Sequence, residues 1–106
     1  MLEDPNLIRF TQDSIGNLIH TLGGESVPLD DFIGALQSGA ISPQEVEPIA
    51  VFYDTEGNLW SLDNRRLYAA RKAGVPVNTR PATPEEFNRR NISTKNNGGW
   101  PCVRGK

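Results

Sequence analysis

The sequence contains few of the side chains on which metal and redox sites are commonly built. Its 106 residues include one cysteine, one histidine and one methionine. A single cysteine excludes an internal disulfide and a multi-cysteine metal site, and a single histidine excludes a histidine pair. No run approaches 18 consecutive apolar residues, and the chain does not open with a basic region followed by an apolar run. We therefore expect neither a membrane span nor a general export signal.

The two rare side chains are expected to be structural. Cys102 is interpreted as a structural or incidental thiol rather than a nucleophile. His20 stands beside Leu18, Ile19 and Leu22. A lone histidine in such surroundings is more often a packing residue than a catalyst.

Length and composition predict one ordinary domain. A chain of 106 residues, 37% of them hydrophobic, can bury one modest core without disulfides or metals. Ten glycines and eight prolines interrupt the sequence, so its elements are expected to be short. The expected fold class is α+β, with a small mixed sheet and short flanking helices.

The net charge of −2 conceals an asymmetry along the chain. Residues 1–64 hold eleven acidic side chains and one basic one, a net of −10, whereas residues 65–106 hold ten basic and two acidic ones, a net of +8. This asymmetry suggests a cationic face suited to a polyanion. The alternative is that the two halves interleave in the fold and their charges pair on a mixed surface.

Periodicity predicts the strands and one helix. Apolar and polar residues alternate over 7–11, which predicts a strand followed by a polar corner at 12–14. Apolar residues at helical spacing predict an amphipathic helix over 28–36 that ends before Gly39. Two β-rich runs, 49–53 and 58–62, predict a hairpin.

Capping signals predict the remaining elements. The capping-box pattern at 42–45 predicts a single helical turn, and the same pattern at 83–86 opens a short helix. Residues 76–80 are predicted to form a further strand. The last sixteen or so residues, 91–106, form a polar, glycine-containing tail.

The junction between the hairpin and the next helix is the most informative place in the sequence. A helix is predicted over 65–73, with Asp63 or Asn64 as its N-cap. Arg65 and Arg66 then fall in its first turn, where cations oppose the helix dipole. An anion bound there would satisfy both arginines and the free backbone N–H groups, which predicts a phosphate site. Alternatively, both arginines form surface ion pairs with nearby carboxylates.

The order of three motifs resembles a known family. Residues 8–14 read Ile-Arg-Phe-Thr-Gln-Asp-Ser, residues 39–43 read Gly-Ala-Ile-Ser-Pro, and residues 62–67 read Leu-Asp-Asn-Arg-Arg-Leu. Together they resemble the ParB/sulfiredoxin-like fold, and more closely the ParB-like toxin domains at the C-termini of bacterial polymorphic toxins. The resemblance covers roughly residues 7–78.

The resemblance implies a nuclease toxin domain, 1–106, that belongs to a larger secreted protein. It implies delivery into a target cell, action in that cell's cytoplasm on nucleic acid with DNA favoured over RNA, and a cognate immunity protein. The cationic second half leads us to expect an immunity protein that is acidic at the interface.

Phosphodiester cleavage requires groups that neutralise the phosphate and activate a nucleophile. Arg65 and Arg66 suit neutralisation. Asp63 is the best-placed general base or ligand of a divalent cation such as Mg²⁺, and Asn64 is placed to orient water or a phosphate oxygen. Helix capping alone would also explain either residue.

Further contacts are expected from both ends of the chain. Arg9, Gln12 and Ser14 would converge on the same site if their strand lies alongside the Trp60 strand. The tail is suited to tracking a phosphate backbone and stacking a base, or else it is solvated with Trp100 anchored in the core. The expected nucleic-acid contacts are Arg71, Lys72, Arg89, Arg90, Lys95, Trp100 and Arg104.

Two other functions fit the same sequence. One is a nucleotide-dependent phosphotransferase or hydrolase on the same fold, although the chain lacks a Walker-type glycine loop. The other is a non-catalytic DNA-binding module.

Overall fold

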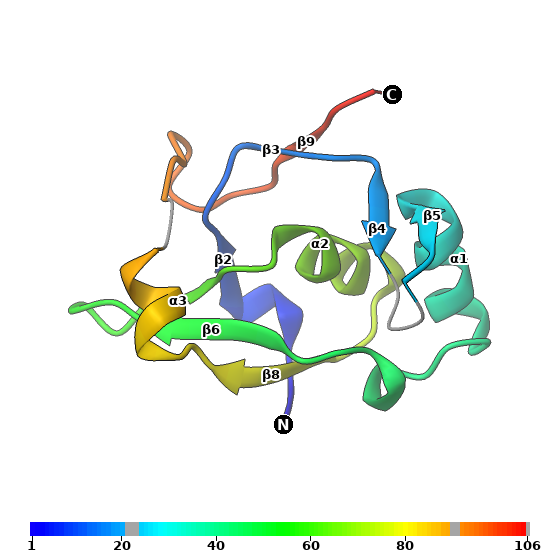
Figure 1. Cartoon of the computed structure of the whole chain (residues 1–106), viewed down its shortest axis with the longest axis horizontal. Helices are drawn as coiled ribbons and strands as arrows, with labels where there is room; N and C mark the ends of the chain where they lie inside the picture. The colour runs from blue at the N-terminus through cyan, green and yellow to red at the C-terminus, as the bar shows by residue number, and fades with distance from the viewer. Residues whose placement is uncertain (21–23, 90–91, 106) are drawn as a thin grey trace.

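The fold is organised around a curled five-stranded mixed sheet (Figure 1). A computed structural model describes residues 1–20, 24–89 and 92–105. The strand order is β1 (Leu2–Glu3), β8 (Val77–Pro81), β6 (Ile49–Tyr53), β7 (Leu59–Ser61) and β2 (Ile8–Phe10). The β6 strand is parallel to β8 and antiparallel to β7, β7 is parallel to β2, and β1 is antiparallel to β8.

Two small ribbons and short helices surround this sheet. In the ribbons, β3 (Ser14–Ile15) pairs in parallel with β9 (Cys102–Val103), and β4 (Leu18–His20) pairs antiparallel with β5 (Ser26–Pro28). The helices are α1 (Leu29–Ser38), α2 (Asn64–Ala73) and α3 (Pro84–Asn88), and the 3₁₀ turns are η1 (Pro5–Leu7) and η2 (Pro43–Glu45). The predicted α+β class with a small mixed sheet is confirmed. Across the described ranges, no helix has the length and apolar character needed to span a membrane.

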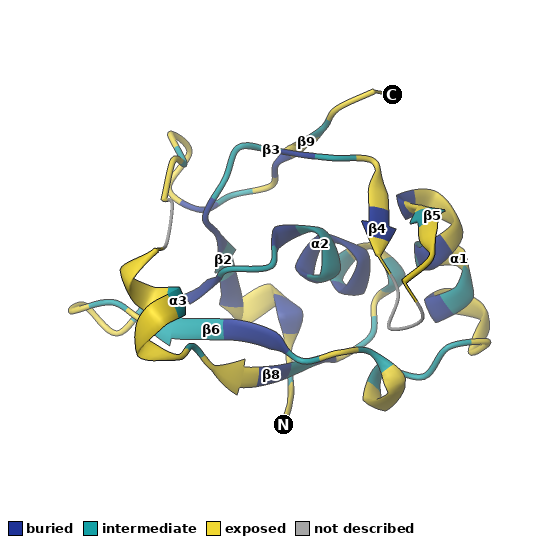
Figure 2. Ribbon diagram, in the orientation of Figure 1, coloured by how far each residue is buried: buried dark blue, intermediate teal, exposed yellow. Residues whose placement is uncertain are grey.

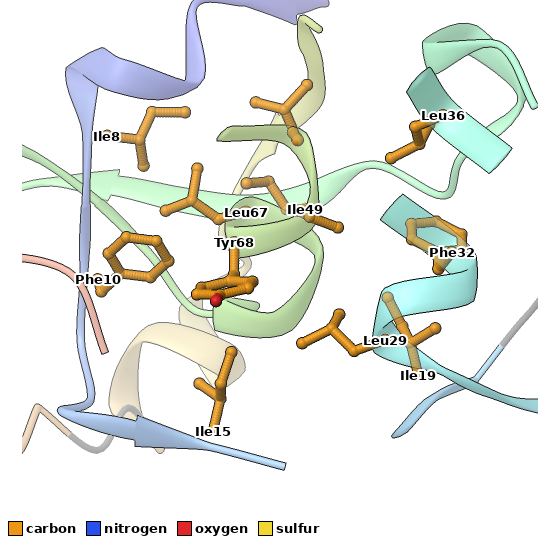
Figure 3. Close-up of a cluster of buried hydrophobic side chains, with 13 residues drawn as sticks. Ile8, Phe10, Ile15, Ile19, Leu29, Phe32, Leu36, Ile49, Leu67 and Tyr68 are labelled. Atoms are coloured by element: carbon orange, nitrogen blue, oxygen red, sulfur yellow. The ribbon is translucent and has the colours of Figure 1, made fainter. Parts of the chain in front are cut away.

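Helix α2 lies in the middle of the molecule and carries the centre of the hydrophobic core (Figures 1 and 2). Its Leu67 side chain is fully buried, as are Ile8 of β2 and Ile49 of β6. Phe32 and Leu36 extend the core to α1, as Figure 3 shows. Burying a leucine side chain contributes about 1.5–3 kcal/mol. The N-terminus of α2 is therefore held on a firmly packed element.

The helix boundaries follow the signals in the sequence. Helices α1 and α2 end at Gly39 and Gly74, with φ of 82° and 71°, a left-handed conformation that glycine adopts without a Cβ penalty. The Ser42 N–H donates to Glu45 Oε1 (3.2 Å), and the Glu86 N–H donates to Thr83 Oγ1 (3.2 Å). Both predicted capping boxes are confirmed, and the predicted strands match β2, β6, β7 and β8 to within one or two residues.

The structure corrects the expectation for His20. Alternation along β4 turns Ile19 inward, where it is 1% exposed, and leaves His20 exposed. The His20 Nδ1 atom lies 2.9 Å from Ser26 Oγ across the ribbon. The interpretation of His20 as a core packing residue is therefore wrong.

The tail is also more ordered than a solvated segment. The Phe10 N–H donates to the Gly98 carbonyl (3.1 Å), and the Cys102 N–H donates to the Asp13 carbonyl (2.8 Å). These bonds, together with the β3–β9 pairing, fasten the end of the chain along β2 and β3. Trp100 thereby lies against Tyr68 and Lys72 of α2.

Candidate functional site

The β7–α2 junction is fixed by a hydrogen-bonded turn. Ser61 Oγ donates to the Asp63 carbonyl and accepts from the Asp63 N–H, both at 2.9 Å. Asp63 Oδ1 then accepts from the Arg66 N–H at 3.3 Å. Asp63 is therefore the N-cap of α2, which settles the choice between Asp63 and Asn64.

Asn64 ties the start of α2 to the end of β2. It is 7% exposed, its Oδ1 accepts from the Thr11 N–H (2.8 Å), and its Nδ2 donates to Thr11 Oγ1 (3.0 Å). The Thr11 hydroxyl in turn donates to the Ser61 carbonyl (2.9 Å). These bonds explain a buried amide without a ligand, so the geometry gives Asn64 a positioning role.

An open cavity of about 530 Å³ lies at the N-terminus of α2. The corner after β2, the segment before β6, the end of β8, α3 and the tail all contribute to its walls. Its charged lining residues are Arg65, Arg66, Arg80, Arg104, Glu47, Asp63 and Glu86. Four cations and three carboxylates thus face one space.

Arg66 is paired with carboxylates from the acidic half of the chain. Its guanidinium contacts the Asp63 carboxylate, lies 3.5 Å from Glu47 Oε2, and donates to the His20 carbonyl at 2.7 Å. The expected surface pairing therefore holds for Arg66, and the two halves of the chain interleave here.

Arg80 is paired as well. Its guanidinium donates two hydrogen bonds to the Glu86 carboxylate, at 2.7 Å and 2.8 Å. This contact, together with the hydrogen bond from the Thr83 N–H, lowers the pKa of Glu86 to about 2. The hydrogen bond to Glu86 also raises the pKa of Arg80. The pair joins β8 to α3 at the cavity wall.

Arg65 and Arg104 have no such partner. Within residues 1–20, 24–89 and 92–105, the ion pairs closer than 4 Å involve only Arg66 and Arg80. Arg65 Nη1 donates to the Leu18 carbonyl and Arg104 Nη1 to Ser14 Oγ, both at 2.8 Å.

The two unpaired guanidinium groups converge on one point of the backbone. A Cβ atom placed on Gly16 would lie 3.8 Å from Arg65 Nη1 and 3.9 Å from Arg104 Nη2. Two like charges held near each other favour an anion between them, and a planar guanidinium suits the oxygens of a phosphate. We refer to Arg65 and Arg104 with Gly16 as the arginine pair.

The corner after β2 reaches the site, but Arg9 does not. Gln12 lines the cavity, and Ser14 holds Arg104. Although β2 does lie alongside β7, alternation places Arg9 on the sheet face opposite Ile8 and Phe10. There its guanidinium lies 5.6 Å from the Trp60 ring centroid and donates to Asn97.

The expected nucleic-acid contacts are spread over several surfaces. Arg71 is half-buried and donates to the Pro5 and Ile8 carbonyls, and burial lowers its pKa, so structural contacts account for it. Arg89 is exposed at the end of α3. Lys95 is exposed, and its N–H donates to Asp13 Oδ2 (2.6 Å). Arg90 lies outside the described residues.

The carboxylates in the cavity do not form a recognisable metal centre. The described residues contain no group of three or more His, Cys, Asp or Glu side chains placed to hold a metal ion. Asp63 and Glu47 both contact Arg66, so their charge is already compensated. We therefore derive no step through a protein-held metal.

Sequence reasoning missed three of the charged residues that line the cavity. Glu47 and Arg80 reach it from segments without a recognisable motif, and Glu86 reaches it from the capping box at 83–86. The capping box at 83–86 identified Glu86 as structural, and the charge asymmetry marked Arg80 only as one of many cations. Gly16, on which Arg65 and Arg104 converge, belongs to no motif that was recognised in the sequence.

Comparisons with protein-family models, with curated proteins and with solved structures found no significant match to this chain.

Proposed function

We propose that this chain is a nucleic-acid-cleaving toxin domain with a ParB/sulfiredoxin-like arrangement, acting on DNA in preference to RNA. The observation that carries the proposal is the arginine pair, which has no acidic partner in the described chain and opens onto the same cavity as Asp63. The motif order from residue 7 to 78 supports the toxin assignment. In this proposal the domain is delivered as part of a longer secreted effector.

Three charged residues have separate roles in the proposed cleavage reaction. Arg65 and Arg104 bind the scissile phosphate and neutralise the charge that develops on its oxygens. Asp63, whose carboxylate is oriented by the Arg66 contacts, takes a proton from a water molecule as that water attacks phosphorus. The P–O ester bond breaks, and the leaving oxygen takes a proton from solvent.

An open, polar cavity favours a polymer over a small nucleotide. The cavity adjoins a second hollow lined by Asp13, Ser14 and Lys95, with Gln12 and Arg104 shared between the two. A nucleic-acid backbone can continue from one hollow into the next, whereas a mononucleotide would occupy only one. This continuity supports cleavage of a chain over hydrolysis of a free nucleotide.

The purified protein should be incubated with supercoiled plasmid DNA, with single-stranded DNA and with total RNA, each in the presence of Mg²⁺, of Mn²⁺ and of a chelator. We expect nicking or degradation of DNA, and we expect production of the protein inside bacteria to be lethal. Nucleoside triphosphate hydrolysis, measured in parallel, tests the phosphotransferase alternative. Intact plasmid, single-stranded DNA and RNA after prolonged incubation with folded protein would refute the nuclease proposal, and tight binding without cleavage would identify a DNA-binding module.

A further inference from the structure

The end of the tail alternates between buried and exposed residues. Pro101 is buried and Val103 is half-buried, whereas Trp100, Cys102 and Arg104 are exposed. Pairing with β3 holds Cys102 and Val103 extended, and the chain turns at Arg104. Trp100 and Arg104 are thus exposed just before and just after the short β9 strand.

The Trp100 ring is held in place and yet open to solvent. Its centroid lies 5.8 Å from that of Phe10 and 5.6 Å from that of Tyr68. Arg71 Cζ and Lys72 Nζ lie 5.1 Å and 5.0 Å from the same centroid. Even so, 46% of the residue is exposed. Packing against Phe10 and Tyr68 explains why the ring is held in place, but it does not explain why so much of the residue is exposed to solvent.

Helix α2 connects the arginine pair with the Trp100 ring. Arg65, Tyr68 and Lys72 are spaced i, i+3 and i+7, so they share one side of the helix. Arg65 converges with Arg104, and Lys72 lies against Trp100. The rise along a helix separates Arg65 from Lys72 by about 10 Å. One side of α2 thus has a phosphate-binding cation at one end and, at the other, a lysine that lies against the Trp100 ring.

We propose that Trp100 is a stacking platform for an unpaired base of single-stranded DNA whose backbone phosphate is held by the arginine pair. Proteins that bind single strands combine a cationic track with exposed aromatic rings, because every base has a face that can stack. In a duplex both faces of each internal base are already stacked on neighbours. A fixed, partly exposed tryptophan that contacts the same side of α2 as the phosphate site therefore favours a single strand over a duplex.

This inference rests on the proposed function only where it concerns cleavage of the bound strand. Binding of the strand does not depend on cleavage and is measured separately. The probes are a short fluorescein-labelled oligothymidylate, a blunt duplex that contains it, and the matching oligouridylate. Fluorescence anisotropy is recorded with a chelator present, in the Asp63→Asn background if cleavage persists. We expect oligothymidylate to bind more tightly than the duplex and than oligouridylate, and to quench the tryptophan fluorescence.

Variants at Trp100 separate stacking from packing. Trp100→Leu keeps an apolar side chain against Phe10 and Tyr68 and should weaken oligothymidylate binding about 5- to 140-fold, the range expected for losing one stacked base. Trp100→Phe retains a stacking face and should restore most of the affinity. Tyr53→Leu removes another exposed aromatic ring, at the end of β6 away from the cavity, and should leave binding unchanged. Thermal unfolding of each variant identifies those that are folded.

The possible results are distinct. Unchanged affinity in folded Trp100→Leu, or a preference for duplex, overturns the stacking platform even if the protein cleaves DNA. A preference for oligouridylate overturns the assignment to DNA. Trp100-dependent binding of oligothymidylate by a protein that cleaves nothing supports the platform and refutes the nuclease proposal.

Discussion

The four arginines of the cavity differ in what surrounds their charge. Arg66 and Arg80 contact carboxylates, whereas Arg65 and Arg104 donate only to a backbone carbonyl and a hydroxyl among the contacts of the described chain. A neutral acceptor leaves the positive charge uncompensated. Of the four cavity arginines, Arg65 and Arg104 are therefore the two whose charge a bound phosphate would stabilise most.

Arg104→Ala should therefore lower the rate of DNA cleavage by about 10²- to 10³-fold, comparable with losing one preorganised oxyanion donor. The exposed Arg89, which does not line the cavity, provides the matched control, and Arg89→Ala should change the rate little. Rates are measured on plasmid under single-turnover conditions. If both arginines bind one phosphate, Arg65→Ala combined with Arg104→Ala should cost less than the two separate losses together. Strictly additive losses would show that they act at different phosphates.

Asp63 has a structural and a proposed chemical role, and Asp63→Asn separates them. Asparagine remains a good N-cap, and a partly exposed ion pair contributes about 0–1 kcal/mol, so the free energy of unfolding should fall by no more than about 1 kcal/mol. Cleavage and toxicity should be largely lost, because the side chain no longer accepts a proton. Full activity in the folded variant would mean that Asp63 only caps α2, and that Glu47 or another carboxylate is the base.

The β6–β7 hairpin depends on one carboxylate at its turn. Asp54 accepts from the N–H groups of Glu56 (2.9 Å) and Asn58 (2.8 Å) and from the indole N–H of Trp60 (2.9 Å). The bond from Trp60 is the largest of the causes that lower the pKa of Asp54 to about 2, against an ordinary value of 3.8. A lowered pKa stabilises the fold above the ordinary value, and this stabilisation is lost as the pH falls through about 2.

Asp54→Asn should accordingly lower the thermal midpoint at neutral pH, and its difference from the parent should shrink as the pH drops from about 4 to 2. Glu86→Gln should behave alike, because the pKa of Glu86 is lowered from 4.5 to about 2 by Arg80. Circular dichroism melts across this pH range provide the measurement. A difference from the parent that does not vary with pH would contradict the assigned role of the charge.

Gly98 lies at a point of the tail where a side chain does not fit. Gly98 has a φ of 81°, and a Cβ atom there would lie 2.6 Å from the Cβ of Arg9. Gly57 also has a positive φ, of 85°, but has open space around it. Gly57→Ala should cost only the left-handed conformation, about 1–2 kcal/mol. Gly98→Ala should cost more and should also impair cleavage, because it displaces the segment that carries Arg104. Chemical denaturation measures the loss of stability, and plasmid assays measure cleavage. Equal effects of Gly57→Ala and Gly98→Ala would argue against a role of the tail in positioning Arg104.

The contrast between the elements that could and could not be predicted has a physical basis. Helices α1 and α2 and the β6–β7 hairpin have enough residues to show a period, and their ends have caps or glycines. The β3–β9 pair has two residues in each strand, which is too short for any period, and joins Ser14 to Cys102 from opposite ends of the chain. That pairing brings Arg104 to Gly16. The composition of the tail predicted contacts with nucleic acid, but the meeting of Arg104 with Arg65 could not be predicted.

Over the whole molecule the two charged halves pair only in part. Glu47 and Asp63 from the acidic half compensate Arg66, while Arg65, Lys95 and Arg104 from the basic half show no ion pair in the described chain. These three cations line the cavity or the adjoining hollow, whereas Arg71, Lys72 and Arg89, which also show no ion pair in the described chain, lie elsewhere. The charge asymmetry of the sequence is thus retained where a polyanion would bind.

A toxin of this kind must be neutralised in the cell that makes it, and the same uncompensated cations offer a target for an acidic inhibitor. We expect a protein selected from a bacterial genomic library for rescue of cells producing this chain to carry clustered Asp and Glu side chains that face residues 65–104. Electrostatic steering should make its association rate fall about 10-fold or more as salt is raised. Arg104→Gln should slow association, whereas Thr55→Glu, an equal change of net charge on the exposed β6–β7 turn, should have little effect. Stopped-flow binding measures both rates, and a tight complex whose interface avoids every basic side chain between 65 and 104 would refute the electrostatic basis of inhibition.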